Sequence, residues 1–309
     1  MKQLVVLSGK GGTGKTSLVA SFAALAQRKI FADCDVDAAD LHLVVGARIR
    51  HRELFRSGKK ARILSVKCTE CGECERVCRF DAVKKNGVVP ACFHIDRISC
   101  EGCGVCLQVC PADAIVLEEV VSGEWFVSET RYGPMTHAKL GIAEGNSGKL
   151  VSLVRSQARG IALKEGLNLI IIDGPPGIGC PVIASITGTD LVLVVTEPTL
   201  SGLHDLRRVH QLANHFKIRT VVCINKFDLN PEMSTTIEDA CRADGIEVIG
   251  RIPYDRIVTE AQVHFTSVIE YSNGSVSEEI KRIWKRVAQI LDADEGQKKL
   301  SGPLVQHGE

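Results

Sequence analysis

Nine of the thirteen cysteines fall between residues 68 and 110, and eight of these nine form two sets that share one spacing. Each set reads C-x2-C-x2-C-x3-C, and the second set repeats the first 32 residues later. Three thiolates in one tight loop can bind three corners of an iron–sulfur cubane, whereas the fourth cysteine lies too far along the chain to close the same cube. The spacing therefore predicts two [4Fe-4S] clusters bound by Cys68, Cys71, Cys74, Cys78, Cys100, Cys103, Cys106 and Cys110.

Zinc and disulfides are the competing explanations for these cysteines. Structural zinc prefers two separated C-x2-C pairs around a tetrahedral ion, so a third cysteine at the same step is surplus. The apolar stretch at the N-terminus is too short for a signal peptide, and no apolar run reaches the ~18 residues that a membrane span needs. We therefore expect a cytoplasmic protein, in which a reducing environment disfavours disulfides.

The other cysteines do not share this spacing. Cys34, Cys223 and Cys241 lie in apolar or helical stretches, which predicts that they are buried. Cys180 is interpreted as a small residue packed at the start of a helix, with a redox or cluster-transfer thiol as the alternative. The sequence assigns no role to Cys92, which lies between the two sets.

A second chemical motif lies near the N-terminus, where residues 9–16 read GKGGTGKT and match G-x-x-x-x-G-K-S/T. Glycines let the backbone curl so that several N–H groups point at a phosphate, and the helix that follows adds its positive N-terminal end. We expect Lys15 to neutralise the β- and γ-phosphates and the Thr16 hydroxyl to ligate Mg²⁺. The alternative is a glycine-rich turn with a surface lysine. The residues expected to bind the nucleotide here are Gly11, Gly12, Thr13, Gly14, Lys15 and Thr16.

Two acidic residues follow apolar runs and are expected to complete this site. Asp35 follows the run at residues 30–34, and Asp173 follows the run at residues 168–172. The carboxyl ends of neighbouring parallel strands converge on one sheet edge, where the phosphate loop also lies. We expect Asp173 to hold Mg²⁺ through water, Asp35 to orient or deprotonate the attacking water, and the Gly177 amide to sense the γ-phosphate. The alternative is that such carboxylates are helix N-caps.

Outside the cysteine-rich segment, short apolar runs alternate with helical patterns, as in a parallel sheet covered on both faces. Strands precede and follow this segment, so it interrupts one domain. We therefore expect an α/β P-loop NTPase fold with a mostly parallel sheet at residues 1–58 and 118–309, and a small inserted α+β domain at residues 59–117. The expected strands are residues 4–7, 30–34, 168–172, 190–196 and 220–224, and the expected helices are residues 14–27, 202–215, 234–243 and 277–291.

Composition and charge exclude several classes of protein. Hydrophobic residues make up 45% and charged residues 24% of the chain, which is the profile of a folded globular protein rather than a disordered or fibrous one. The net charge is +1, whereas a protein that binds duplex DNA through many phosphates carries a basic excess, so we expect no nucleic-acid partner. The helix at residues 277–291 has one apolar face, which favours packing on the sheet over the alternative of membrane binding.

A second lysine, Lys10, stands early in the phosphate loop. With it, the loop resembles the deviant Walker-A ATPases, which include MinD, ParA, Mrp and the nitrogenase iron protein. Together with the cysteines, the chain resembles MinD/Mrp-superfamily ATPases that carry an inserted bacterial-type ferredoxin domain with two [4Fe-4S] clusters. The resemblance runs from the first strand to about residue 291, and further similar stretches are residues 33–43, 173–180, 196–199 and 252–255.

This resemblance implies ATP as the nucleotide and a homodimer, or a heterodimer with a paralogue, in which Lys10 reaches the partner's nucleotide. It also implies crossed cluster ligation, because in bacterial-type ferredoxins the fourth cysteine of each set binds the other cluster. Arg79 stands where proline usually follows that cysteine, which weakens the turn signal but leaves the ligand set unchanged. The implied ligand sets are Cys68, Cys71, Cys74 and Cys110 for one cluster, and Cys78, Cys100, Cys103 and Cys106 for the other.

The sequence leaves two interpretations of the base. Residues 225–228 read NKFD, the N-K-x-D pattern that GTPases use for guanine, and Asp228 could accept hydrogen bonds from two guanine N–H groups. The resemblance implies ATP instead, with Asn225 contacting adenine. We expect ATP, because a four-residue pattern is weak by itself.

Three functions fit these motifs. The first is an ATPase whose nucleotide-driven dimer changes control electron transfer through the clusters to a redox or metallocofactor client, as in the nitrogenase iron protein. The second is an ATP-dependent carrier in iron–sulfur or metal cluster assembly, as in Mrp. The third is a ParA/MinD-like positioning ATPase with structural clusters. Eight cysteines fully satisfy two clusters, which favours retained, electron-carrying clusters over transferable ones.

Overall fold

The structure is a computed structural model that describes residues 1–85, 93–141 and 147–300. Cys92 lies outside the described residues. The chain divides into two compact units, which are described separately. Unit 1 comprises Met1–Arg52, Phe126–Lys139 and Gly148–Glu309, and unit 2 comprises Glu53–Trp125 and Leu140–Ser147.

Nine strands of the described chain form one sheet, and its central strands are apolar runs buried on both faces. In spatial order they are β11 (Glu247–Ile252), β10 (Arg219–Asn225), β9 (Leu191–Thr196), β1 (Lys2–Ser8), β8 (Leu169–Pro176), β2 (Lys29–Asp33), β7 (Gly133–Leu140), β6 (Ile115–Thr130) and β3 (Arg48–Ile63). The pairs from β11 through β9, β1, β8 and β2 to β7 are parallel. The predicted α/β fold with a mostly parallel sheet is therefore confirmed.

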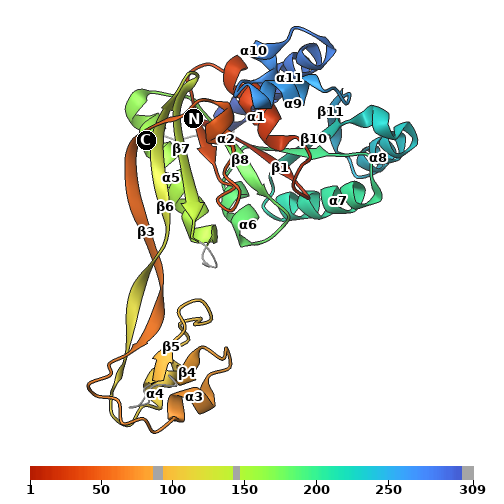
Figure 1. Cartoon of the computed structure of the whole chain (residues 1–309). Helices are drawn as coiled ribbons and strands as arrows, with labels where there is room; N and C mark the ends of the chain where they lie inside the picture. Colours follow the sequence, from red (N-terminus) through yellow and green to blue (C-terminus); the bar gives the residue numbers. More distant parts are fainter. Residues whose placement is uncertain (86–92, 142–146, 301–309) are drawn as a thin grey trace, which may run out of the picture. The chain divides into compact units, whose positions relative to one another are not determined.

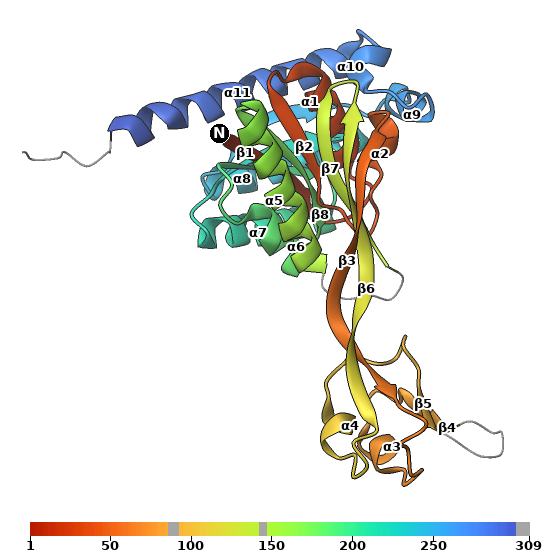
Figure 2. The ribbon, with the colours of Figure 1, turned by 90° about the vertical axis from the view of Figure 1, so that its left-hand side faces the viewer.

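Helices cover both faces of this sheet (Figure 1 and Figure 2). The step from β1 to β2 crosses the sheet in the opposite direction from the steps β8 to β9 to β10 to β11. Because such crossovers are right-handed, the connecting helices lie on opposite faces. One face carries α1 (Lys15–Leu25), α2 (Leu41–Val44), α9 (Ile257–Val263), α10 (Val268–Tyr271) and α11 (Ser275–Leu300), and the other carries α5 (Ser147–Glu165), α6 (Cys180–Ile186), α7 (Leu200–His215) and α8 (Pro231–Ala243).

Helix α11 packs its apolar face against unit 1, as the sequence predicts. Ile283 and Val287 are fully buried in the core, and the Trp284 ring centroid lies 5.0 Å from that of Phe22 in α1. The alternative of membrane binding through this face is wrong, because the face is already covered. Within the described ranges, no helix is long and apolar enough to cross a bilayer.

Strands β3 and β6, each of 16 residues, are not predicted by the sequence. From the sequence, the polar stretches at residues 56–62 and 118–123 are expected to be edges of the inserted segment, whereas both stretches lie inside these strands. Most side chains of β3 are exposed, so the strand lacks the alternation of apolar and polar residues that marks a half-buried strand. Elements β7, β11 and α5 are likewise not predicted by the sequence.

Unit 2 contains the cysteine-rich segment, and its backbone follows the internal repeat. Helices α3 (Glu73–Val77) and α4 (Val105–Gln108) begin after Gly72 and Gly104, whose φ angles are 77° and 78°. Asp81 and Asp113, also 32 residues apart, have φ of 48° and 47°. The hairpin of β4 (Val83–Lys85) and β5 (Phe93–Ile95) packs with Ile115 and the cysteines in a small core. The two halves of the repeat therefore share one local conformation.

Candidate functional site

A cavity of about 590 Å³ lies in unit 1 at the carboxyl ends of the parallel strands. The loop after β1 forms one wall, Asp35 follows β2, and Pro176 ends β8. Asn225 at the end of β10 and Tyr254 after β11 complete the lining on the far side. A volume of this size suits a nucleotide-sized ligand.

The loop between β1 and α1 has a conformation that depends on its glycines. Gly12 and Gly14 have φ of 79° and 86°, in the left-handed region that other residues disfavour. A Cβ on Gly14 would also lie 2.4 Å from Asn225 Nδ2, so no side chain fits there. Gly14 caps α1 without a side-chain hydrogen bond, which leaves the first N–H groups of the helix available for an anion.

Lys15 is buried at the centre of the site, between two of the predicted carboxylates. Its Nζ lies 2.7 Å from Asp173 Oδ1 and 3.4 Å from Asp35 Oδ2. Burial by itself would lower the pKa of Lys15, but the charges of Asp173 and Asp35 raise it above its ordinary value. The structure therefore brings together the lysine and both acidic residues that the sequence nominates.

Asp33 is a further acidic residue of this cluster, to which the sequence motifs assign no role. It is fully buried, and its Cα is in register with that of Asp173 on the neighbouring strand. Its Oδ1 accepts a hydrogen bond from the Asp35 N–H at 3.1 Å. Burial and then the charge of Asp173 raise the pKa of Asp33 well above its ordinary value. The alternation Asp-x-Asp at a strand end was the available sequence signal.

Two carboxylate oxygens in the cluster lack hydrogen-bond partners among the described residues. They are Oδ2 of Asp33 and Oδ2 of Asp173, and both are buried. Buried polar atoms are normally satisfied by protein, water or an ion. Carboxylate oxygens are also the donors that Mg²⁺ prefers, often through its water ligands. Thr16 lines the cavity, and its hydroxyl together with the carboxylates of Asp33 and Asp173 has the donor chemistry that suits a hydrated Mg²⁺ ion.

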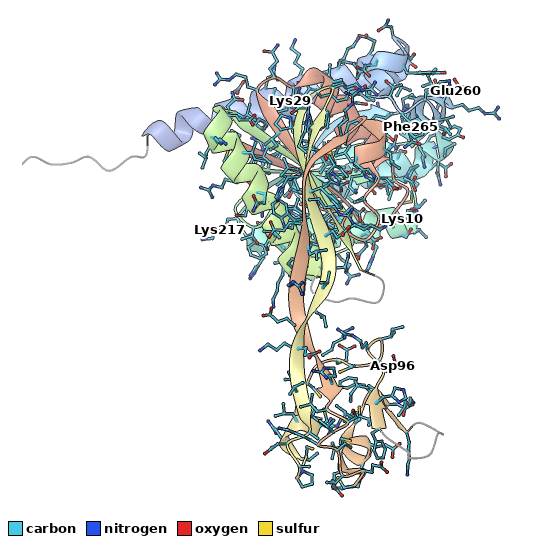
Figure 3. The ribbon with its side chains drawn as sticks, turned by 60° about the vertical axis from the view of Figure 1, so that its left-hand side comes forward. Lys10, Lys29, Asp96, Lys217, Glu260 and Phe265 are labelled. Carbon is cyan, nitrogen blue, oxygen red and sulfur yellow. The ribbon has the colours of Figure 1, made fainter. Side chains whose placement is uncertain are left out.

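Lys10 lies at the surface of unit 1, at the edge of the same loop (Figure 3). Its Nζ is 3.1 Å from Glu197 Oε2, and its side chain is 40% exposed. Lys226 binds the other oxygen, Oε1, of the same glutamate. Burial would raise the pKa of Glu197, but the two lysines lower it below its ordinary value. The stretch that contains Glu197 belongs to the sequence resemblance, but its contacts with the lysines are not predicted by the sequence.

Of the two residues proposed to recognise the nucleotide base, one lines the cavity and the other does not. Asn225 lines the cavity and donates from Nδ2 to the carbonyl oxygen of Thr13 at 2.8 Å. Asp228 does not belong to the cavity lining, and its Oδ1 accepts from the Tyr254 N–H at 2.6 Å. The Gly177 amide, nominated for the γ-phosphate, here donates to the Ser8 carbonyl at 3.0 Å.

Unit 2 has two small cavities, each lined by four cysteines. Each cavity combines the first three cysteines of one set with the fourth cysteine of the other set. Within residues 1–85, 93–141 and 147–300, no group of three or more His, Cys, Asp or Glu side chains forms a site for a metal ion. Every described cysteine is a free thiol. One cavity is lined by Cys68, Cys71, Cys74 and Cys110, and the other by Cys78, Cys100, Cys103 and Cys106.

The cysteines outside the two sets are placed as follows. Cys34, Cys223 and Cys241 are buried, as predicted. Cys180 stands at the first position of α6, but it is exposed, so its interpretation as a packed residue is wrong. Pro181 lines the nucleotide cavity next to it.

A glycine loop of this geometry, between a buried parallel strand and a helix, is typical of P-loop nucleotide-binding proteins. Residues 4–268 match the family described as the CobQ/CobB/MinD/ParA nucleotide binding domain, and the chain belongs to this family. The uncharacterised protein MJ0578 of Methanocaldococcus jannaschii is 30% identical over 94% of this chain and 97% of its own length. The uncharacterised protein MJ0579 of the same organism is 24% identical over 88% of this chain and 93% of its own length.

Solved structures share the fold. The septum site-determining protein MinD of Pyrococcus horikoshii, complexed with Mg-ADP, has a TM-score of 0.56 at 16% identity, covering 94% of this chain and 96% of that one. A chain of the MinC:MinD cell division protein complex of Aquifex aeolicus has a TM-score of 0.55 at 17% identity, covering 100% of this chain and 100% of that one. At such identities the likeness concerns the fold alone.

Proposed function

We propose that this protein is an ATPase that uses ATP turnover in a dimer to control electron transfer through two [4Fe-4S] clusters. The ATPase site lies in unit 1, and the clusters are bound in a ferredoxin-like insertion at residues 59–117, with residues 1–58 and 118–309 forming the ATPase domain. The dimer is formed with a second copy or a paralogue, and the electrons serve a redox or metallocofactor client. The observation that carries this proposal is the pair of cavities with crossed cysteine linings in a P-loop protein.

The nucleotide cavity supports ATP as the substrate. Lys15 and the glycines of the phosphate loop line this cavity, and no side chain caps the N-terminus of α1 that follows them. The Asp228 carboxylate is occupied by the Tyr254 N–H and does not line the cavity, which argues against the guanine interpretation. Asn225 remains as the polar side chain for adenine. A similar M. jannaschii protein, 29% identical over 48% of this chain and 58% of its own length, is named an uncharacterised ATP-binding protein.

The acidic cluster gives the site its chemistry. On ATP binding, Lys15 turns to the β- and γ-phosphates, and the carboxylates of Asp33, Asp35 and Asp173 lose their nearest cation. Thr16 and Asp173 would hold Mg²⁺, which supplies charge neutralisation when bound. Asp35 then accepts a hydrogen bond from the attacking water and orients it toward the γ-phosphate. Lys10 of the partner chain stabilises the charge that develops on the phosphates.

Replacement of Lys15 tests the ATPase proposal. Lys15→Ala is expected to lower the ATP hydrolysis rate by at least about 100-fold, because a buried cation that contacts transferring phosphates typically contributes this much. Lys164→Ala, in the last turn of α5, is the matched surface control and should keep the wild-type rate. Wild-type turnover in the Lys15→Ala variant would remove this assignment.

The two cysteine cavities support the crossed ligand sets. In each cavity the fourth thiol comes from the other half of the repeat, as bacterial-type ferredoxins require. Backbone N–H groups reach two of these sulfurs: Ala61 donates to Cys100 Sγ at 3.5 Å and Ala114 to Cys110 Sγ at 3.3 Å. Such hydrogen bonds tune the reduction potential of a thiolate-bound cluster, which would supply one-electron transfer when bound.

Paired serine variants test the crossing directly. Protein purified without oxygen should hold about eight iron atoms per chain. The double variant Cys71→Ser/Cys110→Ser removes two ligands of one proposed cluster and should leave about four iron atoms. The double variant Cys71→Ser/Cys78→Ser removes one ligand from each cluster and should leave almost no iron. Cys241→Ser, outside both cavities, is the control. Equal loss from the two pairs would overturn the crossed assignment, and colourless wild-type protein would overturn the clusters.

A second candidate is a positioning ATPase of the ParA/MinD type in which the clusters are structural. The match to the CobQ/CobB/MinD/ParA nucleotide binding domain, whose description includes MinD and ParA, supports it. In that case, replacing all ligands of one cluster should lower stability but leave any ATP-dependent partner binding intact. Loss of electron transfer to an acceptor such as oxidised cytochrome c, with ATPase unchanged, would instead support the first proposal.

A further inference from the structure

Two lysines of the nucleotide site share one carboxylate. Glu197 follows β9 directly, and its Oε2 lies 3.1 Å from Lys10 Nζ. Its Oε1 pairs with Lys226. Each carboxylate oxygen of Glu197 therefore pairs with a different lysine, so one negatively charged side chain makes ion pairs with two positively charged ones.

Glu197 is an anchored group rather than a mobile surface side chain. Its side chain is 14% exposed, and its backbone carbonyl oxygen accepts a hydrogen bond from the Thr199 N–H at 2.8 Å. A Cβ on Gly202 would lie 2.3 Å from that same oxygen, so the start of α7 packs closely on this backbone. The two lysines keep its pKa below the ordinary value, so the carboxylate is charged at neutral pH. The lysines, not the glutamate, must move if the arrangement changes.

The two lysines differ in how freely their amines can move away from Glu197. Lys226 has a left-handed backbone with φ of 56°, and its Nζ also lies 3.4 Å from the Gly12 carbonyl, so it is tied to the phosphate loop. The Lys10 carbonyl is fixed by the Ser8 hydroxyl at 2.8 Å, but its side chain is 40% exposed. When the Lys10 amine departs, Lys226 still neutralises Glu197, and no unpaired charge is left buried.

We infer that Glu197 is a positioning residue that holds Lys10 on its own chain until the nucleotide of a partner chain competes for the amine. This inference rests on the proposed function, in which Lys10 acts across a dimer. Because the Lys10–Glu197 pair is partly exposed, its loss should change a binding equilibrium by only about two- to fivefold. Glu197 thereby sets the protein concentration at which ATP brings two chains together.

The test compares Glu197→Gln, which keeps the shape and removes the charge, with Glu238→Gln as control. Glu238 makes a comparable pair with Arg251 at 3.3 Å, in α8. The first readout is the rate at which acetic anhydride acetylates Lys10 in nucleotide-free protein, followed by mass spectrometry. We expect a severalfold faster rate in Glu197→Gln, because the amine is no longer shielded, and the wild-type rate in Glu238→Gln and in the charge-conserving Glu197→Asp.

The second readout is dimerisation by sedimentation with a non-hydrolysable ATP analogue. Glu197→Gln should dimerise at about two- to fivefold lower protein concentration than the wild type. The same substitution should have no effect in a Lys10→Ala background, because the residue it controls is missing.

The outcomes separate this inference from the proposed function. Unchanged Lys10 acetylation in Glu197→Gln overturns the positioning role. An equal shift in dimerisation with and without Lys10 also overturns it, since the effect then bypasses this lysine. If the wild type does not dimerise with ATP, the proposed dimer mechanism fails, and the acetylation rates alone decide whether Glu197 holds Lys10.

Discussion

His137 of β7 is a buried histidine at the centre of a stack of rings in unit 1. Its ring centroid lies 5.3 Å from that of His42 in α2 and 4.9 Å from that of Phe126 in β6. Its Nε2 is 2.8 Å from Ser128 Oγ. Burial, followed by the charge of His42, lowers the pKa of His137 from 6.5 to about 4. The buried stack therefore favours an uncharged His137.

This stack predicts a loss of stability in mild acid. Below pH 6.5 the unfolded chain binds a proton at His137, while the folded chain stays unprotonated down to about pH 4. Stability is therefore lost as the pH falls through this window, by about 2 kcal/mol between pH 7 and pH 5. In urea unfolding, the free energy of unfolding of His137→Gln should therefore fall by about 2 kcal/mol less than that of the wild type between pH 7 and pH 5.

The control for this prediction is His215→Gln. His215 is exposed in the last turn of α7, so its removal should leave the pH dependence of unfolding unchanged. If His137→Gln follows the same pH profile as the wild type, another group causes the acid sensitivity.

At the scale of single residues, the sequence predicts which groups are chemically capable but not how they pair. The loop spacing and the strand ends identify Lys15, Asp35 and Asp173, because motif and topology place them at one edge. The contacts of Glu197 depend on Lys10 and Lys226, which are distant from it in the sequence, so no local pattern encodes them. Cys180 shows the same limit, since the start of a helix can be buried or exposed.

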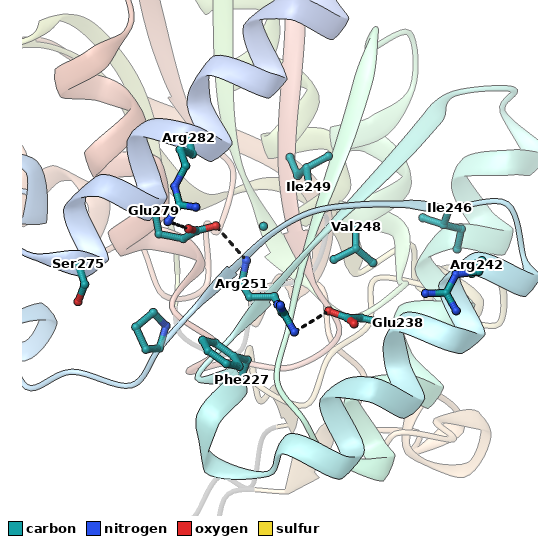
Figure 4. Close-up of a pocket in the computed structure, with 12 residues that line it drawn as sticks. Phe227, Glu238, Arg242, Ile246, Val248, Ile249, Arg251, Ser275, Glu279 and Arg282 are labelled. Carbon is teal, nitrogen blue, oxygen red and sulfur yellow. Dashed lines mark hydrogen bonds and ion pairs between the residues drawn. The ribbon is translucent and has the colours of Figure 1, made fainter.

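At the scale of elements, the edge strand β11 illustrates how the sheet ends. Figure 4 shows it between α8 and α11, beside a cavity of about 750 Å³. The Arg251 N–H donates to Glu279 Oε1 at 3.3 Å, and its guanidinium pairs with Glu238 at 3.3 Å over the Phe227 ring. The register with β10 shifts at Gly250, so the strand is irregular there. Charges and an irregular register protect this edge from pairing with another strand.

Gly250 makes this edge sensitive to substitution. A Cβ there would lie 2.3 Å from Cγ1 of Ile283 in α11, so Gly250→Val should destabilise unit 1 by about 1–3 kcal/mol. Thermal unfolding measures the change, and Ile283→Ala in the same chain should remove part of the clash and give a smaller loss than the two single changes summed.

A second glycine provides the matched control for this edge. Gly160 lies inside α5, and a Cβ added there would have no heavy atom within 4 Å, so Gly160→Ala should stabilise by up to about 1 kcal/mol. Wild-type stability in Gly250→Val would show that α11 can shift away from the strand at no cost.

The strands that the sequence predicts are those whose side chains are buried on both faces of the sheet. Strands β1, β8, β9 and β10 read as continuous apolar runs because both of their faces are covered. Strand β3 carries exposed arginines and lysines along most of its length, so its pairing in the sheet comes from tertiary context rather than from its own pattern. The 32-residue repeat, by contrast, is visible in both sequence and backbone, because its glycines occupy matching left-handed positions.

At the scale of the whole molecule, two strands are shared by the two units. Strand β3 contains the change from unit 1 to unit 2 after Arg52, and β6 contains the change back at Phe126. The chain therefore passes from the P-loop unit to the cysteine-rich unit within β3, and returns within β6.

The proposed coupling predicts that a nucleotide changes the iron centres. We expect a non-hydrolysable ATP analogue with Mg²⁺ to alter the rate at which dithionite reduces the clusters and the electron paramagnetic resonance spectrum of the reduced protein. Lys15→Ala should abolish the response while keeping about eight iron atoms, because it removes phosphate binding and leaves every cluster ligand in place. The Lys164→Ala control should respond like the wild type. A ligand shifts only those equilibria whose two states it binds with different affinity. The coupling would therefore be contradicted if the nucleotide left the reduction rate, the spectrum and the client affinity of the wild type unchanged. This would hold even if the protein hydrolysed ATP and contained both clusters.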